Sequence, residues 1–234
     1  METKVFSSSI AAKPYSWPHD ASFGPEKTAL VVIDMQVDFC APGGYMDSQG
    51  YSIEPARAVI PRIQALLAGF RTAGFPIYHT REGHRPDLST LSSRELLRSR
   101  NNESGLGIGD MGPMGRLLVR GERGHEIVPE LQPLADEPVV DKPGRSAMQY
   151  TDLKLLLDNR GVRNLVLCGV TTDVCVTTTM RDANDMGMDC VIVSDACAAG
   201  REDLHDAALA SICEEGGIFG AVTTTADLLT ALRG

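Results

Sequence analysis

Asn164-Leu-Val-Leu-Cys168 runs directly into Gly169-Val-Thr-Thr-Asp-Val-Cys175-Val and then into Thr-Thr-Thr-Met-Arg181. The first piece is apolar and residues 173–186 have a helical pattern, so this stretch predicts a strand, a tight turn and a helix. Cys175 then falls in the first helical turn. A helix N-terminus stabilises a thiolate, the nucleophilic form of cysteine, and its backbone N–H groups can hold an oxyanion. The alternative is a buried structural cysteine, because free cysteines are commonly buried.

The alternation of strand and helix continues on both sides of this stretch. Short apolar runs predict strands, longer amphipathic runs predict helices, and Thr225 is a plausible N-cap for the last helix. Strands that alternate with helices indicate an α/β fold, a three-layer sandwich with a mainly parallel six-stranded sheet. The expected strands are residues 30–33, 76–80, 138–141, 164–168, 190–194 and 220–224, and the expected helices are 54–72, 151–159, 173–186, 201–215 and 226–232.

Length and composition predict one domain, residues 27–234, preceded by an irregular arm, residues 1–26. The net charge is −9 with no basic block, so nucleic acid and anionic membranes are poor partners. We see no signal-peptide core and no apolar run near the roughly 18 residues of a spanning helix, and we expect a cytoplasmic protein. The six cysteines form no C-x-x-C pair, which favours free thiols in a reducing compartment.

Three reactive residues fall at or just beyond strand ends: Asp34, Lys142 and Cys175. Ligands of such sheets bind outside the carboxyl ends of the strands, so topology brings these groups together. A charged residue at one strand end is usually only a solvated terminus; three complementary groups make a candidate site. The first strand is followed by Asp34-Met-Gln-Val-Asp-Phe39 and not by G-x-G-x-x-G, and there is no Walker lysine motif, so we expect no nucleotide cofactor. His79 and His84 lack further ligands with suitable spacing, so we expect no metal.

The sequence resembles the isochorismatase-like cysteine hydrolases over about residues 27–234. The resemblance is carried by Ile33-Asp34-Met-Gln-Val-Asp-Phe39, Asp141-Lys142-Pro143 and Gly169-Val-Thr-Thr-Asp-Val-Cys175-Val176. It implies a parallel sheet between helices, with Asp34 as the base for the Cys175 thiol and Lys142 as the supporting cation. It also implies a cis Val170–Thr171 peptide, an oxyanion hole from the N–H groups of Thr171 and Cys175, and a homo-oligomer, with a tetramer favoured and a dimer possible.

Within that family, the presence of Cys175 argues against the vinyl-ether-cleaving isochorismatases, which lack the nucleophile. The Asp-x-His metal site of the nicotinamidase branch is missing after the first strand. Residues 79–87, 107–110 and 141–145 look most like the ureide branch, which includes biuret, triuret and ureidoacrylate hydrolases. The resemblance therefore implies an amidohydrolase that releases ammonia from a small ureide through a thioester. We expect Lys142 and the helix end to lower the thiol pKa.

Three further residues are predicted to contact the substrate. Arg145 can donate to carbonyl oxygens, Glu215 can accept from urea-type N–H groups, and Phe39 can form a wall. Two of the three also have a plain structural alternative: Glu215 as a solvated helix end, and Phe39 as a core residue. The biuret hydrolases that the chain resembles carry Gln at the place of Glu215, which favours triuret. The remaining alternatives are a ureidoacrylate or other N-carbamoyl substrate, bound by Arg145, and a non-catalytic interaction module.

Overall fold

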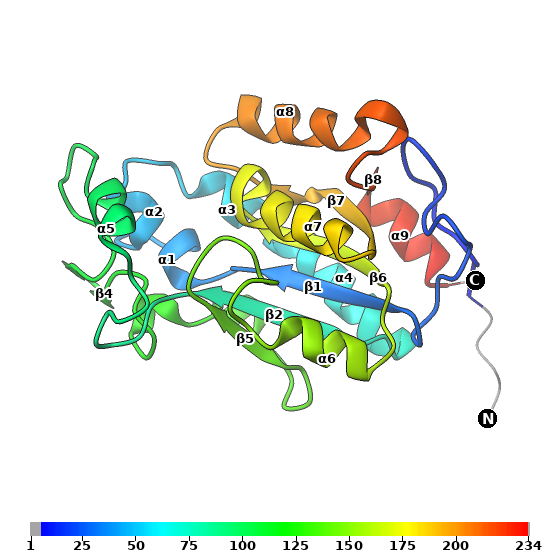
Figure 1. The fold of residues 1–234 in the computed structure, drawn as a ribbon, viewed down its shortest axis with the longest axis horizontal. Helices are drawn as coiled ribbons and strands as arrows, with labels where there is room; N and C mark the ends of the chain where they lie inside the picture. Colours follow the sequence, from blue (N-terminus) through cyan, green and yellow to red (C-terminus); the bar gives the residue numbers. More distant parts are fainter. Residues whose placement is uncertain (1–5, 234) are drawn as a thin grey trace.

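A computed structural model describes residues 6–233; residues 1–5 of the predicted arm, and residue 234, lie outside this range. Within the described residues the centre is a six-stranded sheet in the order β5-β2-β1-β6-β7-β8 (Figure 1). Every neighbouring pair is parallel, which confirms the predicted fold class. The strands are β1 Thr28–Ile33, β2 Ile77–Glu82, β5 Val139–Lys142, β6 Asn164–Val170, β7 Asp189–Ala198 and β8 Ala221–Thr223.

The central strands β1 and β6 are buried along their whole length, as expected for a parallel sheet with helices on both faces. Helices α6 Leu153–Asn159, α7 Thr177–Asp185 and α8 Glu202–Cys213 lie on one face, and α4 Ile60–Ala73 and α9 Thr225–Ala231 lie on the other (Figure 1). The chain winds outward in both directions from β1 and β6. The gap between these two strands at their carboxyl ends is therefore the topological switch point where ligands of such folds bind.

Gly169, near the end of β6, allows β1 and β6 to approach closely. Its φ is +113°, and a Cβ there would lie 2.1 Å from the carbonyl oxygen of Ile33 at the end of β1. No larger side chain fits without pushing the two strands apart. This glycine therefore sets the separation between the chain segments that carry Asp34 and Cys175.

Two predicted helices are interrupted in the structure. The helix expected at 54–72 is α3 Glu54–Ala58 followed by α4, because Pro61 stands in the first turn of α4 and cannot continue the hydrogen bonds of α3. The helix expected at 173–186 begins with a π-helical turn, η3 Thr172–Val176, which holds Cys175, and continues as α7.

The predicted N-cap of the last helix is wrong by one residue. Thr224 caps α9, and its hydroxyl accepts a hydrogen bond from the Asp227 backbone N–H at 3.2 Å. Thr225 is the first helical residue instead, and its hydroxyl donates to Asp195 Oδ1 at 2.9 Å. Both hydroxyl groups thus have hydrogen-bond partners, but Thr224, with its extended backbone, is the residue that caps the helix.

The segments between β1 and α3 and between β2 and β5 contain short elements that periodicity did not predict. Most lie beyond the carboxyl ends of the strands, at the opposite end of the molecule from the arm (Figure 1). They are α1 Val37–Cys40, α2 Tyr45–Ser48, α5 Ser93–Ser99, the hairpin of β3 Met111–Gly112 and β4 Gly115–Arg116, and the turns η1 Arg123–His125 and η2 Pro129–Leu131.

The described part of the N-terminal arm packs on its own domain. Trp17 is fully buried, and its ring lies 6.3 Å from that of Phe23, which lies 5.0 Å from Phe75. Lys13 exchanges two backbone hydrogen bonds with Val222 in β8, at 2.9 and 2.8 Å. The arm therefore covers the outer edge of β8, where free backbone groups would invite pairing with another chain.

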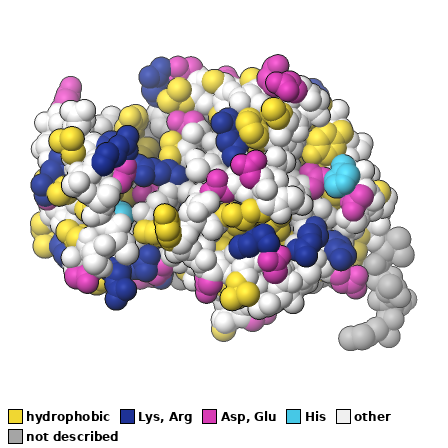
Figure 2. Space-filling view, viewed as in Figure 1, with side chains coloured by type: hydrophobic (Ala, Val, Ile, Leu, Met, Phe, Trp, Pro, Cys, Tyr) yellow, Lys and Arg dark blue, Asp and Glu magenta, His cyan; other side chains and the backbone are white. Residues whose placement is uncertain are grey.

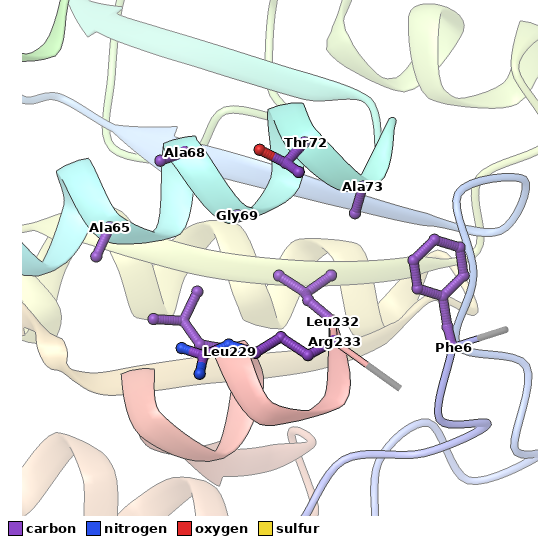
Figure 3. Close-up of a pocket in the computed structure, with 9 residues that line it drawn as sticks. All are labelled: Phe6, Ala65, Ala68, Gly69, Thr72, Ala73, Leu229, Leu232 and Arg233. Atoms are coloured by element: carbon purple, nitrogen blue, oxygen red, sulfur yellow. The ribbon is translucent and has the colours of Figure 1, made fainter. Parts of the chain in front are cut away.

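A groove of 700 Å³ lies between α4 and α9, close to Phe6 of the arm (Figure 3). Its described lining is mostly small or apolar and includes Ala65, Ala68, Leu229 and Leu232. No helix of residues 6–233 is long and apolar enough to cross a membrane. On the face shown in Figure 2, acidic and basic side chains are interspersed rather than separated by sign.

Candidate active site

Four strands deliver four reactive side chains to one buried point. Asp34 follows β1, Glu82 and Lys142 are the last residues of β2 and β5, and Cys175 follows β6. Glu82 and Lys142 are direct partners in the β2–β5 pairing. Asp34, Lys142 and Cys175 were predicted from their strand ends. Glu82 was not, because the second strand was expected to end at Thr80, and extending it by two residues would have revealed it.

Lys142 is the centre of this cluster. Its Nζ lies 2.7 Å from Asp34 Oδ2, 3.5 Å from Glu82 Oε2 and 3.5 Å from Cys175 Sγ, and it donates to the Gly144 carbonyl at 2.7 Å. Burial alone would lower the pKa of Lys142, but attraction to the neighbouring acidic groups, Asp34 above all, outweighs it and raises the pKa. The ammonium is therefore permanently charged at neutral pH and is fully buried.

Asp34 is held from both sides. Its Oδ1 accepts a hydrogen bond from the Thr80 hydroxyl at 2.7 Å, and its Oδ2 faces Lys142. The backbone of Asp34 has φ +51° and donates to the Thr80 carbonyl at 3.2 Å. Burial raises the pKa of Asp34, and the Lys142 charge only partly opposes this. Both carboxylate oxygens are thus engaged away from bulk water.

Glu82 has a different environment and contacts the thiol. The Cys175 Sγ–H donates to Glu82 Oε2 at 3.3 Å. Burial would raise the pKa of Glu82, but Lys142 and then Arg145 outweigh it, so the pKa is lowered. Gln36 fixes the strand end, because its side chain accepts from the Glu82 N–H at 2.7 Å and donates to the Glu82 carbonyl at 3.0 Å.

The expected lowering of the Cys175 pKa is wrong for the resting site. Burial raises the pKa of Cys175 well above its ordinary value, and the two nearby carboxylates add to this; only Lys142 acts in the other direction. The prediction considered Lys142 and the helix end but not desolvation or the second carboxylate. The thiol is therefore protonated at rest, with an acceptor in place for its proton.

The turn between β6 and α7 presents the cysteine as the resemblance implied. The Val170–Thr171 peptide bond is cis. The Thr171 carbonyl accepts hydrogen bonds from the N–H groups of Val174 and Val176, both at 3.1 Å, which closes the turn around Cys175. Thr171 and Cys175 both border the cavity described next. Their N–H groups as an oxyanion hole remain a prediction.

A cavity of 480 Å³ opens above the thiol. Glu82, Thr171 and Cys175 contribute to its lining near the sheet, whereas Asp34 and Lys142 are fully buried behind them. Other parts of its wall come from segments outside the sheet. They include Phe39, Tyr45 and Gln49 from the α1–α2 region, Arg98, Asn101 and Asn102 from and after α5, Arg145 after β5, Gly200 and Arg201 between β7 and α8, and Leu204 in the first turn of α8.

Two of the three predicted substrate contacts line this cavity, and the third does not. Phe39 and Arg145 border it. Glu215 is exposed and stands in the turn Glu214–Gly216, after α8 and before β8. A residue that precedes a parallel strand lies at its amino end, opposite the edge that carries Cys175. Within one chain Glu215 cannot reach a substrate at the thiol, so we do not assign specificity to it.

The outer wall of the cavity carries paired arginines. Glu95 contacts Arg145 and lies 3.0 Å from Arg98, whose guanidinium also donates to the Tyr45 hydroxyl at 3.3 Å. Hydrogen bonds from Arg145, together with those from Arg94 and Arg98, outweigh burial and lower the pKa of Glu95 to about 2. Glu95 therefore orients two cations toward the cavity, and each keeps donors for a ligand.

The donor set at the thiol does not suit a metal ion. Ligand atoms of Asp34, Glu82 and Cys175 lie within 4.8 Å of one another. The Lys142 ammonium already lies within 3.5 Å of all three, so it supplies the positive charge there. His79 lies elsewhere, with its Nε2 3.0 Å from Glu137 Oε2. Metal independence stays a prediction.

Comparison with known proteins agrees with this architecture. The sequence model of the isochorismatase domain matches residues 28–227. A cysteine hydrolase from Pseudomonas syringae pv. phaseolicola is 28% identical with a TM-score of 0.78, covering 96% of this chain and 97% of that chain. An isochorismatase family protein from Desulfovibrio vulgaris is 30% identical with a TM-score of 0.72, over 86% and 96% of the two chains.

A more distant structure shares the fold. The N-carbamoylsarcosine amidase from Thermoplasma acidophilum is 23% identical with a TM-score of 0.64, and the match covers 85% of this chain and 96% of that chain. The sheet, the switch point and the turn that holds the cysteine are those that the resemblance implied. Because the domain model also spans most of the sequence, the chain belongs to the isochorismatase family of hydrolases.

Proposed function

We propose that this protein is a cysteine-dependent amidohydrolase that cleaves a terminal amide C–N bond of a small ureide, triuret or biuret, and releases ammonia. The observation that carries the proposal is the Cys175 thiol at the base of an open cavity with both polar and apolar walls, 3.3 Å from a carboxylate and 3.5 Å from a buried ammonium. A nucleophile with an adjacent proton acceptor and a fixed cation is the arrangement that acyl transfer needs.

The reaction has two halves. The sulfur attacks the carbonyl carbon, its proton leaves to a carboxylate, and the N–H groups of Thr171 and Cys175 stabilise the oxyanion. Collapse of the tetrahedral intermediate breaks the C–N bond and leaves a thioester. Water then attacks the thioester, the C–S bond breaks, and the acid departs. Lys142 stabilises the negative charge on the sulfur when the thiolate forms and again when it leaves.

The lining supports a flat substrate rich in hydrogen-bonding groups. Asn101 and the Tyr45 hydroxyl present polar groups to the cavity, and the amides of Gln49 and Asn102 stand beside them, bonded to each other at 3.2 Å and each to the Leu106 carbonyl at 2.9 Å. A ureide offers carbonyl oxygens and N–H groups in one plane, which such a wall can match. Biuret and triuret are neutral, so they leave the Arg145–Glu95 pair intact.

One observation favours a second candidate, an N-carbamoyl compound that carries a carboxylate. Three arginines line the cavity, Arg98, Arg145 and Arg201, against the two acids Glu82 and Asp173. A locally positive pocket on a chain of net charge −9 favours an anionic ligand, because guanidinium groups bind carboxylates in a bidentate manner. The distant structural neighbour is named for a substrate of this type.

Ammonia release from biuret, triuret, ureidoacrylate and an N-carbamoyl amino acid tests the proposal. We expect kcat/KM to be highest for a neutral ureide, and Cys175→Ser to lower it by at least about 10³-fold. Cys197→Ser, a buried thiol outside the cavity, is the matched control and should retain activity. Exhaustive chelation before the assay should leave all rates unchanged.

The same panel separates the alternatives. A clear preference for the anionic substrates, with a KM that rises about tenfold or more in Arg98→Gln for those substrates alone, would replace the neutral ureide by an N-carbamoyl acid. No ammonia from any member would reject the amidohydrolase and favour a non-catalytic module. Loss of activity on chelation, restored by a divalent ion, would mean that a metal site had been missed.

A further inference from the structure

A second buried aspartate, Asp38, takes no part in the reaction described above. It lies in α1 and is only 1% exposed. The described hydrogen-bond partners of its side chain are two backbone N–H groups, one for each carboxylate oxygen. Two N–H donors need two acceptor oxygens, which an ionised aspartate has and an asparagine lacks. The charge of Asp38 therefore matches a bridge between two chain segments.

The two bonds join separate parts of the site. Asp38 Oδ1 accepts from the N–H of Tyr45, the first residue of α2, at 3.2 Å, and Oδ2 accepts from the Leu118 N–H at 2.9 Å. Tyr45 lines the cavity above the thiol. The Leu118 carbonyl accepts from the His84 N–H at 2.8 Å, two residues beyond the end of β2. One side chain thus ties the α2 wall of the cavity to the strand end that carries Glu82.

The packing around Asp38 leaves its carboxylate little room to move. A Cβ at Gly124 in η1 would lie 2.4 Å from Asp38 Oδ1, and a Cβ at Gly44 would lie 2.7 Å from the Asp38 carbonyl oxygen. Leu118 has φ +50°, a conformation that costs energy for a residue with a side chain. The bond from its N–H to Asp38 helps to hold it there.

We propose that Asp38 is a positioning residue that fixes the α2 wall of the substrate cavity, and that its ionised form is the one that holds this wall in place. This inference rests on the proposed amidohydrolase function and adds a determinant of substrate affinity to it. Asp38 acts through Tyr45 and the rest of α2. If the wall is in place in only a fraction of the molecules, the apparent dissociation constant rises by the inverse of that fraction.

Protonation of Asp38 should release the wall. Burial raises the pKa of Asp38 to about 6, against the two backbone hydrogen bonds, and the nearby charge of Glu122 adds to the rise. A proton on either oxygen puts an O–H group against an N–H donor, so one of the two bonds is lost. The KM of the wild type should therefore rise as the pH falls through about 6.

Other charged or titratable groups lie on the segments packed around Asp38, and Glu122 is the one that acts on its pKa. These groups are Tyr45 and Asp47 in α2, Glu54 and Arg57 in α3, Arg116 in β4, Arg120 and Glu122 after it, and Arg123 and His125 in η1.

Asp38→Asn keeps the shape of the side chain and removes its charge, so one acceptor oxygen becomes an amide donor. At mildly alkaline pH we expect the KM for the best ureide to rise about 5- to 30-fold, the range for one lost hydrogen bond to a charged group, with kcat within about threefold of wild type. The rise of KM at low pH should be absent from this variant. Asp136→Asn, at an exposed aspartate outside the site, is the matched control and should follow wild type throughout.

Glu122→Gln tests the same idea with Asp38 intact. It removes a like charge that raises the pKa of Asp38, so the pH at which KM begins to rise should move to a lower value. A change in packing alone would not move this midpoint. The variant also keeps the proposal testable if Asp38→Asn does not fold.

Hydrogen exchange provides a readout that needs no substrate. The amides of Tyr45 and Leu118 are the two donors to Asp38, so their exchange rates report on the bridge. At mildly alkaline pH they should exchange about tenfold or more faster in Asp38→Asn than in wild type, while the amides of α9 should not change.

Every outcome decides between the two proposals. A KM in Asp38→Asn within about twofold of wild type overturns the role of Asp38, whatever the exchange rates show. A fall in kcat of about tenfold or more at unchanged KM places Asp38 in the chemistry and also overturns it. If the wild type releases no ammonia from any ureide, the amidohydrolase is rejected, and the exchange of Tyr45 and Leu118 still decides whether Asp38 holds α2.

Discussion

The two ends of the central sheet are built on opposite physical principles. At the carboxyl end, three charged groups and a thiol are buried together, with Asp34 and Lys142 completely removed from water. At the amino end, the described part of the arm brings Trp17 and Phe23 against Phe75, beside the Ala-rich groove of Figure 3. At the carboxyl end, reactive groups are desolvated, which costs stability. At the amino end, apolar surface is buried, which stabilises the fold.

This contrast predicts that the two ends can be damaged separately. A change at the carboxyl end should remove activity, and it should also lower stability when it leaves a buried charge without its partner. A change at the amino end should lower stability and leave the chemistry of the folded fraction intact. The three variants below test this, from the largest expected effect to the smallest.

Lys142→Met should have the largest effect, because it removes the cation that lies between Asp34 and Glu82. We expect kcat/KM to fall by at least about 10³-fold and the free energy of unfolding to fall by about 3–5 kcal/mol. Adding Asp34→Asn removes one uncompensated charge, so the double variant should regain part of this stability but no activity. Urea unfolding and ammonia release measure both. If Lys142→Met alone were as stable as wild type, leaving the buried carboxylates without their cation would not cost stability.

Trp17→Ala should act on stability alone. Trp17 is fully buried, so its truncation leaves a cavity and should lower the free energy of unfolding by about 3–5 kcal/mol. The kcat of the folded fraction should not change. Tyr150→Ala is the control, because this side chain is 91% exposed and its loss should change stability by less than about 0.5 kcal/mol. A fall in kcat with stability unchanged would mean that the arm acts on the site.

Glu137→Gln should show the smallest effect, and one that depends on pH. Glu137 lies just before β5 and accepts from Arg71 Nε at 2.7 Å and Arg71 Nη2 at 2.9 Å. Burial would raise the pKa of Glu137, but the hydrogen bonds from Arg71 outweigh it and lower the pKa to about 2. A lowered pKa stabilises the fold above the unfolded value of about 4.3 and ceases to do so as the pH falls toward about 2.

The variant should therefore be less stable than wild type by about 1–2 kcal/mol at neutral pH, an amount that allows for the partial exposure of Arg71. This difference should shrink as the pH falls through about 4 to about 2, while kcat stays the same. Denaturant unfolding of both proteins across that range is the measurement. A difference that does not change with pH would assign the effect to packing rather than to charge.

The parts of the molecule that follow from local pattern were predictable. Buried strands such as 164–168 need apolar runs, and parallel topology places strand ends at one edge, so the sequence pattern alone brings Asp34, Lys142 and Cys175 together. Glu82 was not predicted, because Arg81 and Glu82 look like the start of a polar loop, although pairing with β5 continues through them. The end of β2 is therefore set by its pairing with β5 and not by the local sequence.

The remaining errors concern position and solvation rather than pattern. Glu215 was predicted to contact the substrate from its residue type and from the Gln at the matching place in the biuret hydrolases. A residue that precedes a parallel strand nevertheless lies at the amino end of the sheet. The direction of the Cys175 pKa depends on how completely the thiol is buried and on a carboxylate from another strand. Neither the burial of the thiol nor this second carboxylate can be inferred from the residues around Cys175, so the cysteine motif alone could not predict the direction of the pKa shift.

Much of the cavity wall comes from segments that take no part in the six-stranded sheet, such as the α1–α2 region and the residues around α5. Insertions or substitutions in these segments can accumulate without changing how the strands position the reactive residues at their carboxyl ends. Gly169 offers no such freedom, since any side chain would separate β1 from β6. A library that diversifies Gln49, Asn101 and Asn102 while sparing the strand ends would let this scaffold diverge toward new amides.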